Sequence, residues 1–196
     1  MDRRGAAWYR VAMRRDTFCS FCGAGFADVS AYPRTCTACG VQVWANPIPV
    51  AVVLIPILDG ERAGLLVVRR AIPPVGGLAL IGGFVEEHES WQACAAREVR
   101  EEAGVALDPA ALEPLWYASS EPHPNRLLVF SLAPALRAEE LPPFTPNSEA
   151  SERGVIYGPE GIDAVGTGLV FPLHVEAARR YFAARSIRGP VGFAPR

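Results

Sequence analysis

The chain has 196 residues, a formal net charge of −2 and 50% hydrophobic residues. This length suits one domain of ordinary size with a small appendage, and the near-neutral charge gives no general affinity for nucleic acid or an anionic membrane. No apolar run reaches the length of a membrane span, and the Arg-rich N-terminus lacks the apolar core of a signal peptide. We therefore expect a cytoplasmic protein with no membrane partner.

The first organised segment contains two Cys-x2-Cys pairs separated by residues 23–35, each followed by a glycine. Paired thiolates at this spacing are typical of a zinc site, whereas two unrelated redox or buried pairs are the alternative. Four protein ligands fill the coordination shell, so this Zn²⁺ would be structural. The sequence predicts an N-terminal tail over 1–17 and a zinc ribbon over 18–45. The predicted ligands are Cys19, Cys22, Cys36 and Cys39.

The next segment, residues 46–185, alternates apolar runs with turn signals, and a C-terminal tail over 186–196 follows. Runs rich in β-branched residues between Gly- and Pro-containing turns are typical of strands. A mixed α/β domain is therefore predicted. Its expected strands are 49–58, 64–71, 112–119, 126–136 and 154–157, with loops at 73–77, 120–125 and 141–153.

Two helices are expected in this domain. Ser90 and Gly104 suit the N-cap and the residue after the last turn of a helix over 90–103. Ala96, Val99 and Ala103 share one face of that helix and would pack on a sheet. A second helix is predicted over 174–185, where apolar residues recur with helical spacing.

The stretch from Gly83 to Val105 follows a fixed pattern. It reads Gly, five residues, Glu, seven residues, Arg-Glu-Val, one residue, Glu-Glu, one residue, Gly-Val. Every fixed position matches the signature of the Nudix hydrolase family, so the segment resembles that family, and the strand pattern extends the resemblance to residues 47–185. The resemblance implies an α/β fold: a Nudix α/β/α sandwich with a mixed sheet, preceded here by the small zinc ribbon.

The resemblance also implies a catalytic metal site on the predicted helix. Glu98, Glu101 and Glu102 would hold Mg²⁺ or Mn²⁺, with the carbonyl of Gly83 as a further ligand. Like charges on one helical turn repel, and a divalent cation that prefers oxygen ligands offsets this repulsion. A solvated acidic helix face is the alternative interpretation.

Two further features follow from the resemblance. Arg97 and Glu89 are similar to an ion pair that orients the helix and its preceding loop. Residues 148–157 are similar to the Glu-containing loop before the family's last strand. Glu149, with Glu152 as second choice, would supply a general base or a metal ligand there. The alternative is an exposed loop carboxylate with no role.

The order of the two segments narrows the substrate. A zinc ribbon followed directly by such a domain resembles the NADH pyrophosphatases and their relatives that act on FAD or ADP-ribose. The NADH enzymes carry SQPWPFP after the box, whereas residues 120–125 here read SEPHPN, which keeps Ser and two Pro but loses the aromatic residues. We expect a small-molecule nucleotide, with ADP-ribose or FAD ahead of NAD(H), to be cleaved at its diphosphate to AMP and a second phosphate.

Other functions remain open on the sequence alone. A nucleoside triphosphate pyrophosphohydrolase is one, although the ribbon argues against it. A non-catalytic, nucleotide-sensing Nudix regulator is another, although all the box glutamates are present. Nucleic acid is not favoured as a partner, except that NAD-capped RNA would fit if the groove admits a strand. The resemblance favours a homodimer.

Overall fold

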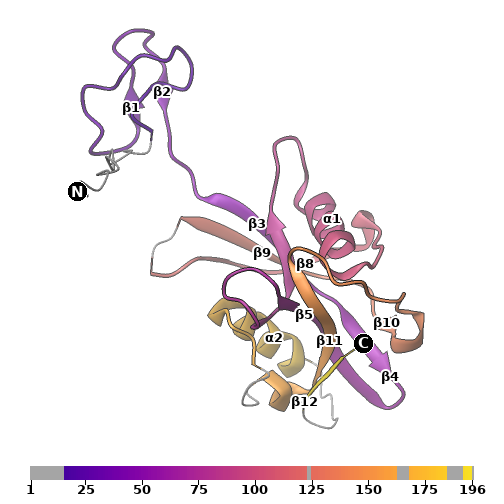
Figure 1. Cartoon of the computed structure of the whole chain (residues 1–196). Coiled ribbons are helices and arrows are strands. Elements are labelled where there is room, and N and C mark those ends of the chain that lie inside the picture. The colour runs from indigo at the N-terminus through magenta and orange to yellow at the C-terminus, as the bar shows by residue number, and fades with distance from the viewer. Residues whose placement is uncertain (1–15, 123–124, 163–167, 185–191, 196) are drawn as a thin grey trace, which may run out of the picture. The chain divides into compact units, whose positions relative to one another are not determined.

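The computed structural model describes residues 16–122, 125–162, 168–184 and 192–195. It divides into two compact units, Met1–Asn46 and Pro47–Arg196, which are described separately below (Figure 1). Most of the tail predicted over 1–17 lies outside the described residues. None of the described helices is long and apolar enough to cross a membrane.

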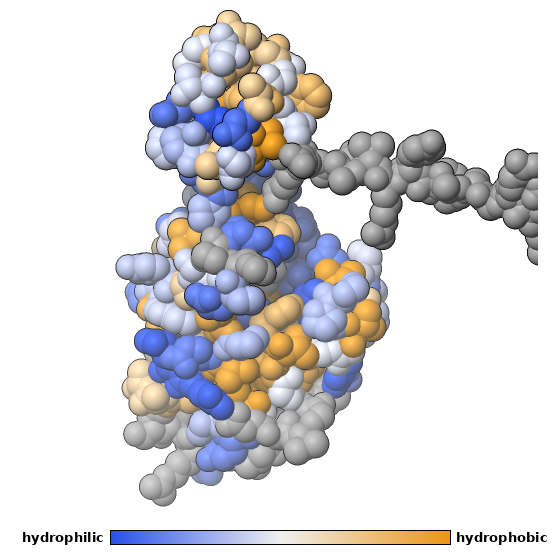
Figure 2. All heavy atoms as spheres, turned by 90° about the vertical axis from the view of Figure 1, so that its left-hand side faces the viewer, coloured by the Kyte–Doolittle hydropathy of each residue, from blue (hydrophilic) through white to orange (hydrophobic). Residues whose placement is uncertain are grey.

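The first unit is a small ribbon built around the two cysteine pairs. Its strands, β1 (Arg34–Thr35) and β2 (Gln42–Val43), pair antiparallel. Gly23 and Gly40 each adopt φ of +74°, and each donates its N–H to the carbonyl of the first cysteine of its pair at 2.8 Å. Because glycine has no Cβ, it adopts this turn without strain. Hydrophobic residues lie beside hydrophilic ones on the surface of this unit (Figure 2).

The second unit contains two mixed sheets. One has the strand order β10-β4-β5-β11-β12, with β6 also paired to β5, and the other has the order β7-β3-β9-β8. The strands of the first sheet are β4 (Pro56–Asp59), β5 (Arg62–Arg70), β6 (Leu78–Ala79), β10 (Leu136–Arg137), β11 (Ala150–Tyr157) and β12 (Gly192–Pro195). Those of the second are β3 (Ile48–Leu54), β7 (Ile81–Phe84), β8 (Glu113–Ser119) and β9 (Arg126–Leu132). The helices are α1 (Trp91–Ala103) and α2 (Pro172–Ala183), with 3-10 turns at Pro109–Ala111, Ala138–Glu140 and Pro159–Ile162.

Two of the predicted strands each divide between the two sheets. The run predicted over 49–58 forms β3 and β4, which separate at Ile55. The run predicted over 126–136 divides in the same way into β9 and β10, and both pairs of segments run parallel. Backbone bonds from Leu66 to Ile55 and from Ala133 to Leu54, both 2.9 Å, hold the crossing points. A continuous apolar run does not reveal such a change of sheet, because its residues are buried on both sides of the break.

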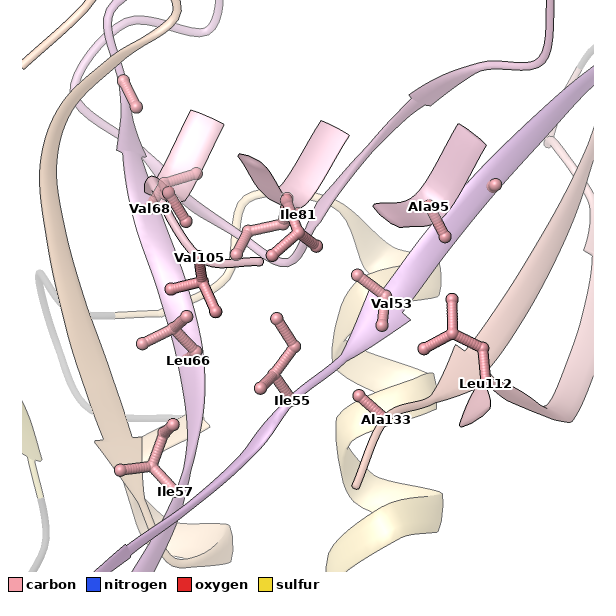
Figure 3. Close-up of a cluster of buried hydrophobic side chains, with 14 of the residues drawn as sticks. Val53, Ile55, Ile57, Leu66, Val68, Ile81, Ala95, Val105, Leu112 and Ala133 are labelled. Carbon is pink, nitrogen blue, oxygen red and sulfur yellow. The ribbon is translucent and has the colours of Figure 1, made fainter. Parts of the chain in front are cut away.

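The two helices cover opposite faces of these strands. Along β3, Ala51 and Val53 pack in the cluster that contains α1 residues, whereas Val52 and Leu54 pack in the cluster that contains α2 residues. Successive strand side chains point to opposite faces, so this alternation buries the strand on both sides. Figure 3 shows the α1-side cluster, in which Val53 and Ala95 lie on facing elements. The architecture is the expected α/β/α sandwich.

Helix α1 begins and ends as predicted. The Ser90 hydroxyl accepts the N–H of Ala93 at 3.1 Å, and Gly104 closes the helix with φ of +69°. The packing face is partly different from the prediction, since Ala96 is only half-buried. The buried residues on the apolar side are Cys94, Ala95, Val99 and Ala103.

The structure differs from the sequence-based prediction of strands in three places. Within residues 78–84, where no strand was predicted, the structure has β6 and β7. The strand β11 begins at Ala150 and not at residue 154, so it takes up part of the predicted loop. The strand β12 lies in the segment assigned to a C-terminal tail and pairs with β11. All three differences involve strands that depend on pairing with other parts of the chain. The sequence of a short polar or Gly-containing segment does not reveal such pairing.

The position at which the chain changes sheet, Ile55, offers a test of the core packing. Ile55 has no exposed surface, so Ile55→Ala leaves a cavity where the chain changes sheet. We expect the free energy of unfolding to fall by about 2–5 kcal/mol, measured by equilibrium urea unfolding. The control is Val75→Ala, whose side chain is exposed in a loop, and which should change stability by no more than about 0.5 kcal/mol. Equal effects of the two substitutions would contradict this account of the core.

Candidate active site

Three glutamates from two distant parts of the chain meet beside α1. Glu98 and Glu102 lie on successive turns of that helix and are buried, and Glu149 lies in the irregular segment before β11 and is exposed. One carboxylate oxygen of each lies within 4.8 Å of the others. The structure thus brings Glu149, predicted only as a candidate, to the carboxylates of the helix.

Burial disfavours the charged forms of the two helix glutamates, Glu98 and Glu102. Burial, followed by the neighbouring charges of Glu98 and Glu149, raises the pKa of Glu102 to about 8. Burial is also the main cause that raises the pKa of Glu98. Carboxylates whose charges repel in a poorly solvated place are a site for a compensating cation.

The donor set fits a hard divalent metal ion. Mg²⁺ and Mn²⁺ prefer oxygen ligands, and carboxylates on a helix and on a loop leave coordination positions for water and substrate. Glu98, Glu102 and Glu149 are the side chains that would hold such an ion. Its presence and identity belong to the proposal below.

Gly83 makes room for this arrangement. It lies in β7, and a Cβ built on it would stand 2.2 Å from Oε1 of Glu98. Its carbonyl faces the Cys94 thiol, with 3.7 Å between the sulfur and the oxygen. Any larger residue at this position would push the Glu98 carboxylate away. The predicted role of the Gly83 carbonyl as a metal ligand stays a prediction.

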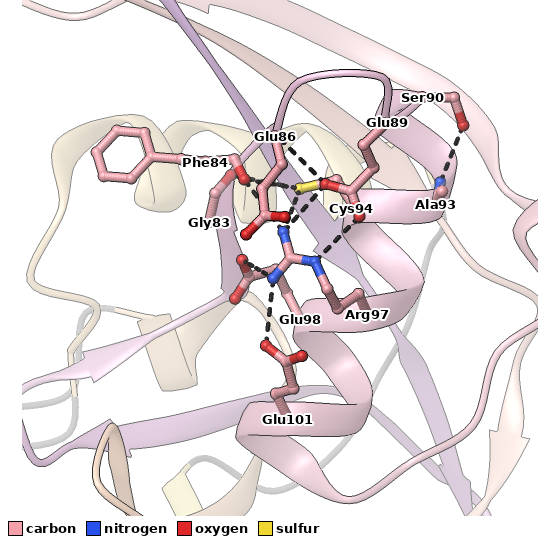
Figure 4. A network of polar contacts seen from close by, with 10 residues as sticks. All are labelled: Gly83, Phe84, Glu86, Glu89, Ser90, Ala93, Cys94, Arg97, Glu98 and Glu101. Carbon is pink, nitrogen blue, oxygen red and sulfur yellow. Dashed lines mark hydrogen bonds and ion pairs between the residues drawn. The ribbon is translucent and has the colours of Figure 1, made fainter.

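Arg97 joins the helix to the loop that precedes it (Figure 4). Its guanidinium donates to both carboxylate oxygens of Glu89, at 3.0 and 3.1 Å, which is the expected ion pair. It also donates to Oε1 of Glu98 at 2.7 Å and to the Phe84 carbonyl at 3.2 Å. The hydrogen bond to Arg97 is the main cause that holds the pKa of Glu89 below its usual range. Arg97 therefore orients Glu98 and fixes the loop at the same time.

The two remaining predicted carboxylates lie apart from the cluster. Glu101 is exposed, lines the same pocket and accepts a hydrogen bond from Arg97 at 3.2 Å. Among the described residues it is not part of the three-carboxylate group, and its role as a metal ligand stays a prediction. Glu152 lies on β11, where Nε of Arg69 donates to its carboxylate at 2.7 Å, away from the pocket residues. Of the two candidate loop glutamates, only Glu149 lies at the cluster.

The carboxylates lie in the wall of a pocket of about 910 Å³. Besides Arg97, two arginines line it: Arg70 at the end of β5 and Arg126 at the start of β9. Each packs over an aromatic ring that also lines the pocket, with Arg70 5.0 Å from the Phe171 centroid and Arg126 5.6 Å from that of Phe84. Nε of Arg70 is buried and has no hydrogen-bond partner among the described residues. The pocket thus combines carboxylates, cations and flat apolar surfaces.

The pocket contains residues that the sequence analysis did not single out. The only local signal for Arg70 was its place in the charged end of an apolar run. The sequence contained no signal for Phe171 or His174. Ser120 and Glu121, from the segment compared with the NADH signature, do line the pocket. His123 and Pro124 of that segment lie outside the described residues.

The aromatic residues just before that segment lie elsewhere. Trp116 stacks on Phe130 with 5.2 Å between centroids, and Tyr117 is 73% exposed. Neither lines the pocket, so neither replaces the missing aromatic residues of the NADH signature.

The first unit contains a separate cysteine cluster. The sulfur atoms of the four predicted ligands all lie within 4.8 Å of one another, which fits a zinc ribbon. The separations are 3.8 Å between Cys19 and Cys39, and 3.6 Å between Cys22 and Cys36. Hydrogen bonds from the backbone of Cys39 and then Ala38 lower the pKa of the Cys36 thiol to about 7. The pKa of the Cys39 thiol is raised to about 12, because a backbone hydrogen bond from Val41 is outweighed by burial and the neighbouring thiols. Cys94 is buried in the other unit, as a packing residue.

His174 forms the buried end of the pocket wall. Its Nδ1 accepts the N–H of Leu80 at 3.2 Å, which requires the neutral imidazole at that nitrogen. Burial, followed by the charge of Arg70, lowers the pKa of His174 to about 3. The histidine is therefore a structural acceptor between α2 and the strand region, and not a proton carrier at neutral pH.

Comparison with known proteins places this geometry in a family. The family model described as "NUDIX domain" matches residues 47–157. The NAD-capped RNA hydrolase NudC of Stutzerimonas stutzeri is 36% identical over 114 residues, which cover 57% of this chain and 38% of that protein. NudC of Pseudomonas aeruginosa is 33% identical over 132 residues, 66% of this chain and 44% of that protein. These matches thus span less than half the length of either relative. The crystal structure of a NUDIX hydrolase from Nitrosomonas europaea is similar in fold, with a TM-score of 0.60 and 24% identity over 90% of this chain and 96% of that one.

Zinc binding by the ribbon can be tested directly. Metal analysis of protein purified without added zinc should find about one equivalent per chain. Cys36→Ser removes one ligand and should lower the zinc content severalfold or more. Cys94→Ala is the matched control, since it removes a buried cysteine outside the cluster and should leave zinc unchanged. Four free thiols and no zinc in the native protein would refute the site.

His174 makes the stability depend on pH in a definite direction. Its unfolded pKa is 6.5 and its folded pKa is about 3, so in this window the unfolded chain binds a proton that the folded chain does not. The contribution of His174 to the free energy of unfolding is therefore fully present above pH 6.5. As the pH falls from 6.5 toward 3, the free energy of unfolding decreases by about 1.4 kcal/mol per pH unit. His174→Gln keeps an acceptor for Leu80 without titrating, so urea unfolding should show a shallower acid loss. Identical slopes for both proteins would contradict the assignment.

Proposed function

This chain belongs to the Nudix family, and from that premise we propose that it hydrolyses the diphosphate of a nucleoside diphosphate linked to another group. ADP-ribose, FAD and NAD(H) are the candidate substrates. Water attacks one phosphorus, the bridging P–O bond breaks, and AMP and a second phosphate ester leave. The observation that carries the proposal is the cluster of Glu98, Glu102 and Glu149 in a pocket wall.

The carboxylates would hold the metal ion that this reaction needs. When bound there, Mg²⁺ or Mn²⁺ supplies positive charge against the diphosphate and lowers the pKa of a coordinated water. Glu98 and Glu102 are fixed by the helix, and Arg97 orients Glu98 through their 2.7 Å hydrogen bond. Glu149 comes from the segment before β11 and is the exposed member of the three, so we assign it the acceptance of a proton from the attacking water.

The rest of the pocket suits an anionic molecule with flat ends. Arg70 and Arg126 offer cationic donors, and the Nε of Arg70 lacks a protein partner among the described residues. Phe84 and Phe171 offer ring faces on which a base can pack. A volume of about 910 Å³ is large for one nucleotide and suits two linked moieties.

Within this class, we expect ADP-ribose or FAD to be preferred to NADH. Ser120 and Glu121 of the segment 120–125 line the pocket, but the segment lacks the aromatic residues of the NADH signature, and Trp116 and Tyr117 do not replace them. One lost stacking contact is worth about 0.5–1.5 kcal/mol, so two together change discrimination by about tenfold. Hydrolysis of NAD-capped RNA is a second candidate, favoured by the names of the NudC relatives.

The substrate class is tested by one panel. The kcat/KM for ADP-ribose, FAD, NADH, NAD⁺ and dGTP, measured with Mg²⁺ and again with Mn²⁺, should be highest for ADP-ribose or FAD, with AMP identified by chromatography. Glu102→Gln should lower kcat/KM by about 100-fold or more, because it removes a buried charge at the metal site.

The control for that variant is Glu87→Gln, since Glu87 is a highly exposed glutamate in the loop before α1. It should retain activity within about twofold. A clear preference for dGTP would overturn the substrate class. A clear preference for NADH would overturn only the argument from residues 120–125.

A further inference from the structure

Glu149 is the member of the carboxylate cluster whose position is hardest to explain. Glu98 and Glu102 are held by the backbone of α1, but Glu149 lies in a segment with no regular structure and reaches the cluster from another part of the chain. A carboxylate that serves a metal site must be held within a fraction of an ångström of its working position. Some contact must therefore fasten this segment to the helix.

The side chain of Asn147 makes that connection. Its amide nitrogen donates to the carbonyl of Glu101 at 3.0 Å and to that of Glu102 at 3.3 Å. Both carbonyls belong to the last turn of α1, where backbone acceptors have no partner within the helix. The amide oxygen of Asn147 accepts the backbone N–H of Glu149 at 2.9 Å and that of Ala150 at 2.8 Å. One side chain thus joins the helix that carries two carboxylates to the backbone that carries the third.

The chemistry of this position suits asparagine. Its two ends face groups of opposite kind, carbonyl oxygens on one side and N–H donors on the other. A side-chain amide matches both, because its NH2 carries two donors and its oxygen accepts two hydrogen bonds. These neighbours also determine which terminal atom of the Asn147 amide is the oxygen and which is the nitrogen. Aspartate would keep the acceptor, but it would place a negative charge against the negative end of the helix dipole.

Other contacts hold the same segment independently of Asn147. The carbonyl of Glu149 accepts the N–H of Ala71 at 2.7 Å. The buried Arg153 donates to the carbonyls of Ala103, at 2.7 Å, and Pro142, at 2.6 Å. Loss of the Asn147 side chain should therefore shift Glu149 locally without unfolding the segment.

We propose that Asn147 is a positioning residue that sets the Glu149 carboxylate against Glu98 and Glu102, and that it acts through Glu149 on metal affinity and turnover. This inference rests on the proposed function only in taking the cluster to be a metal site. It adds a residue outside the Gly83–Val105 motif, which touches neither the substrate nor the metal.

The test is Mn²⁺ binding without substrate, followed by electron paramagnetic resonance, on the full chain. Asn147→Ala should weaken Mn²⁺ binding by about tenfold, as loss of an outer contact to a metal ligand does. Asn147→Asp should weaken it as much, because the tie to the helix carbonyls is lost. Binding by Asn147→Asp within about twofold of the parent would show that the local turn is sufficient and would overturn the proposal.

A double substitution separates positioning from general damage. Glu149→Gln alone should weaken binding, and Asn147→Ala added to it should change the affinity by no more than about twofold, since its effect passes through Glu149. Additive effects would overturn the proposal. Ser148→Ala, an exposed neighbour in the same segment, is the matched control and should bind Mn²⁺ like the parent.

The outcome does not depend on finding the substrate. If the parent binds Mn²⁺ and the affinity depends on Asn147, the inference stands even where no dinucleotide is hydrolysed, and only the proposed function fails. If the dinucleotides are hydrolysed but Asn147→Ala binds Mn²⁺ and turns over like the parent, the proposed function stands and this inference fails. A parent that binds no Mn²⁺ overturns both.

Discussion

The crowding of three carboxylates in a partly dry pocket wall is the constraint on which the rest of the second unit depends. Oxygens of Glu98, Glu102 and Glu149 lie within 4.8 Å of one another, and such charges repel strongly where water is scarce. The fold must hold them together against this repulsion until a cation offsets it. It does so with a capped helix, with Arg97, which donates to Glu98, and with Asn147, which joins the helix to the segment of Glu149.

The sheet supplies the close approach that this grouping needs. Gly83 in β7 lacks the side chain that would displace Glu98, and a Cβ on the preceding Gly82 would stand 2.2 Å from the carbonyl of Ala51 in β3. Helix α1 can therefore lie directly over β7 and β3, with Val99 and Ala103 buried beneath it. Packing of the helix on these strands thus places Glu98 and Glu102, which precede Val99 and Ala103, beside the sheet at the edge of the pocket.

Sequence reasoning reached the parts of this site that are local in the chain. The cap residues Ser90 and Gly104 predicted the ends of α1, and helical periodicity predicted its acidic side. The pairing of Arg97 with Glu89 was implied by the resemblance to the Nudix family. Sequence reasoning could not predict that the run over 49–58 divides between two sheets at Ile55. The contributions of Arg70 and Asn147 were equally hidden, since each acts through a neighbour far away in the sequence.

The same long-range contacts bring the positive charge of Arg70 and the carboxylate cluster into one pocket. The N–H of Ala71 binds the carbonyl of Glu149 at 2.7 Å, so Arg70, one residue earlier, is fixed to the segment that carries the third carboxylate. Arg70 also acts on Glu102, whose pKa its charge lowers against the larger effect of burial. A diphosphate bound in this pocket, as proposed above, would meet the Arg70 guanidinium as well as the carboxylate cluster. Positive charge near the scissile bond favours attack on phosphorus. The end of β5 and the segment of Glu149 are held together by the bond from Ala71 to Glu149 and by the pairing of Arg70 with Ala150.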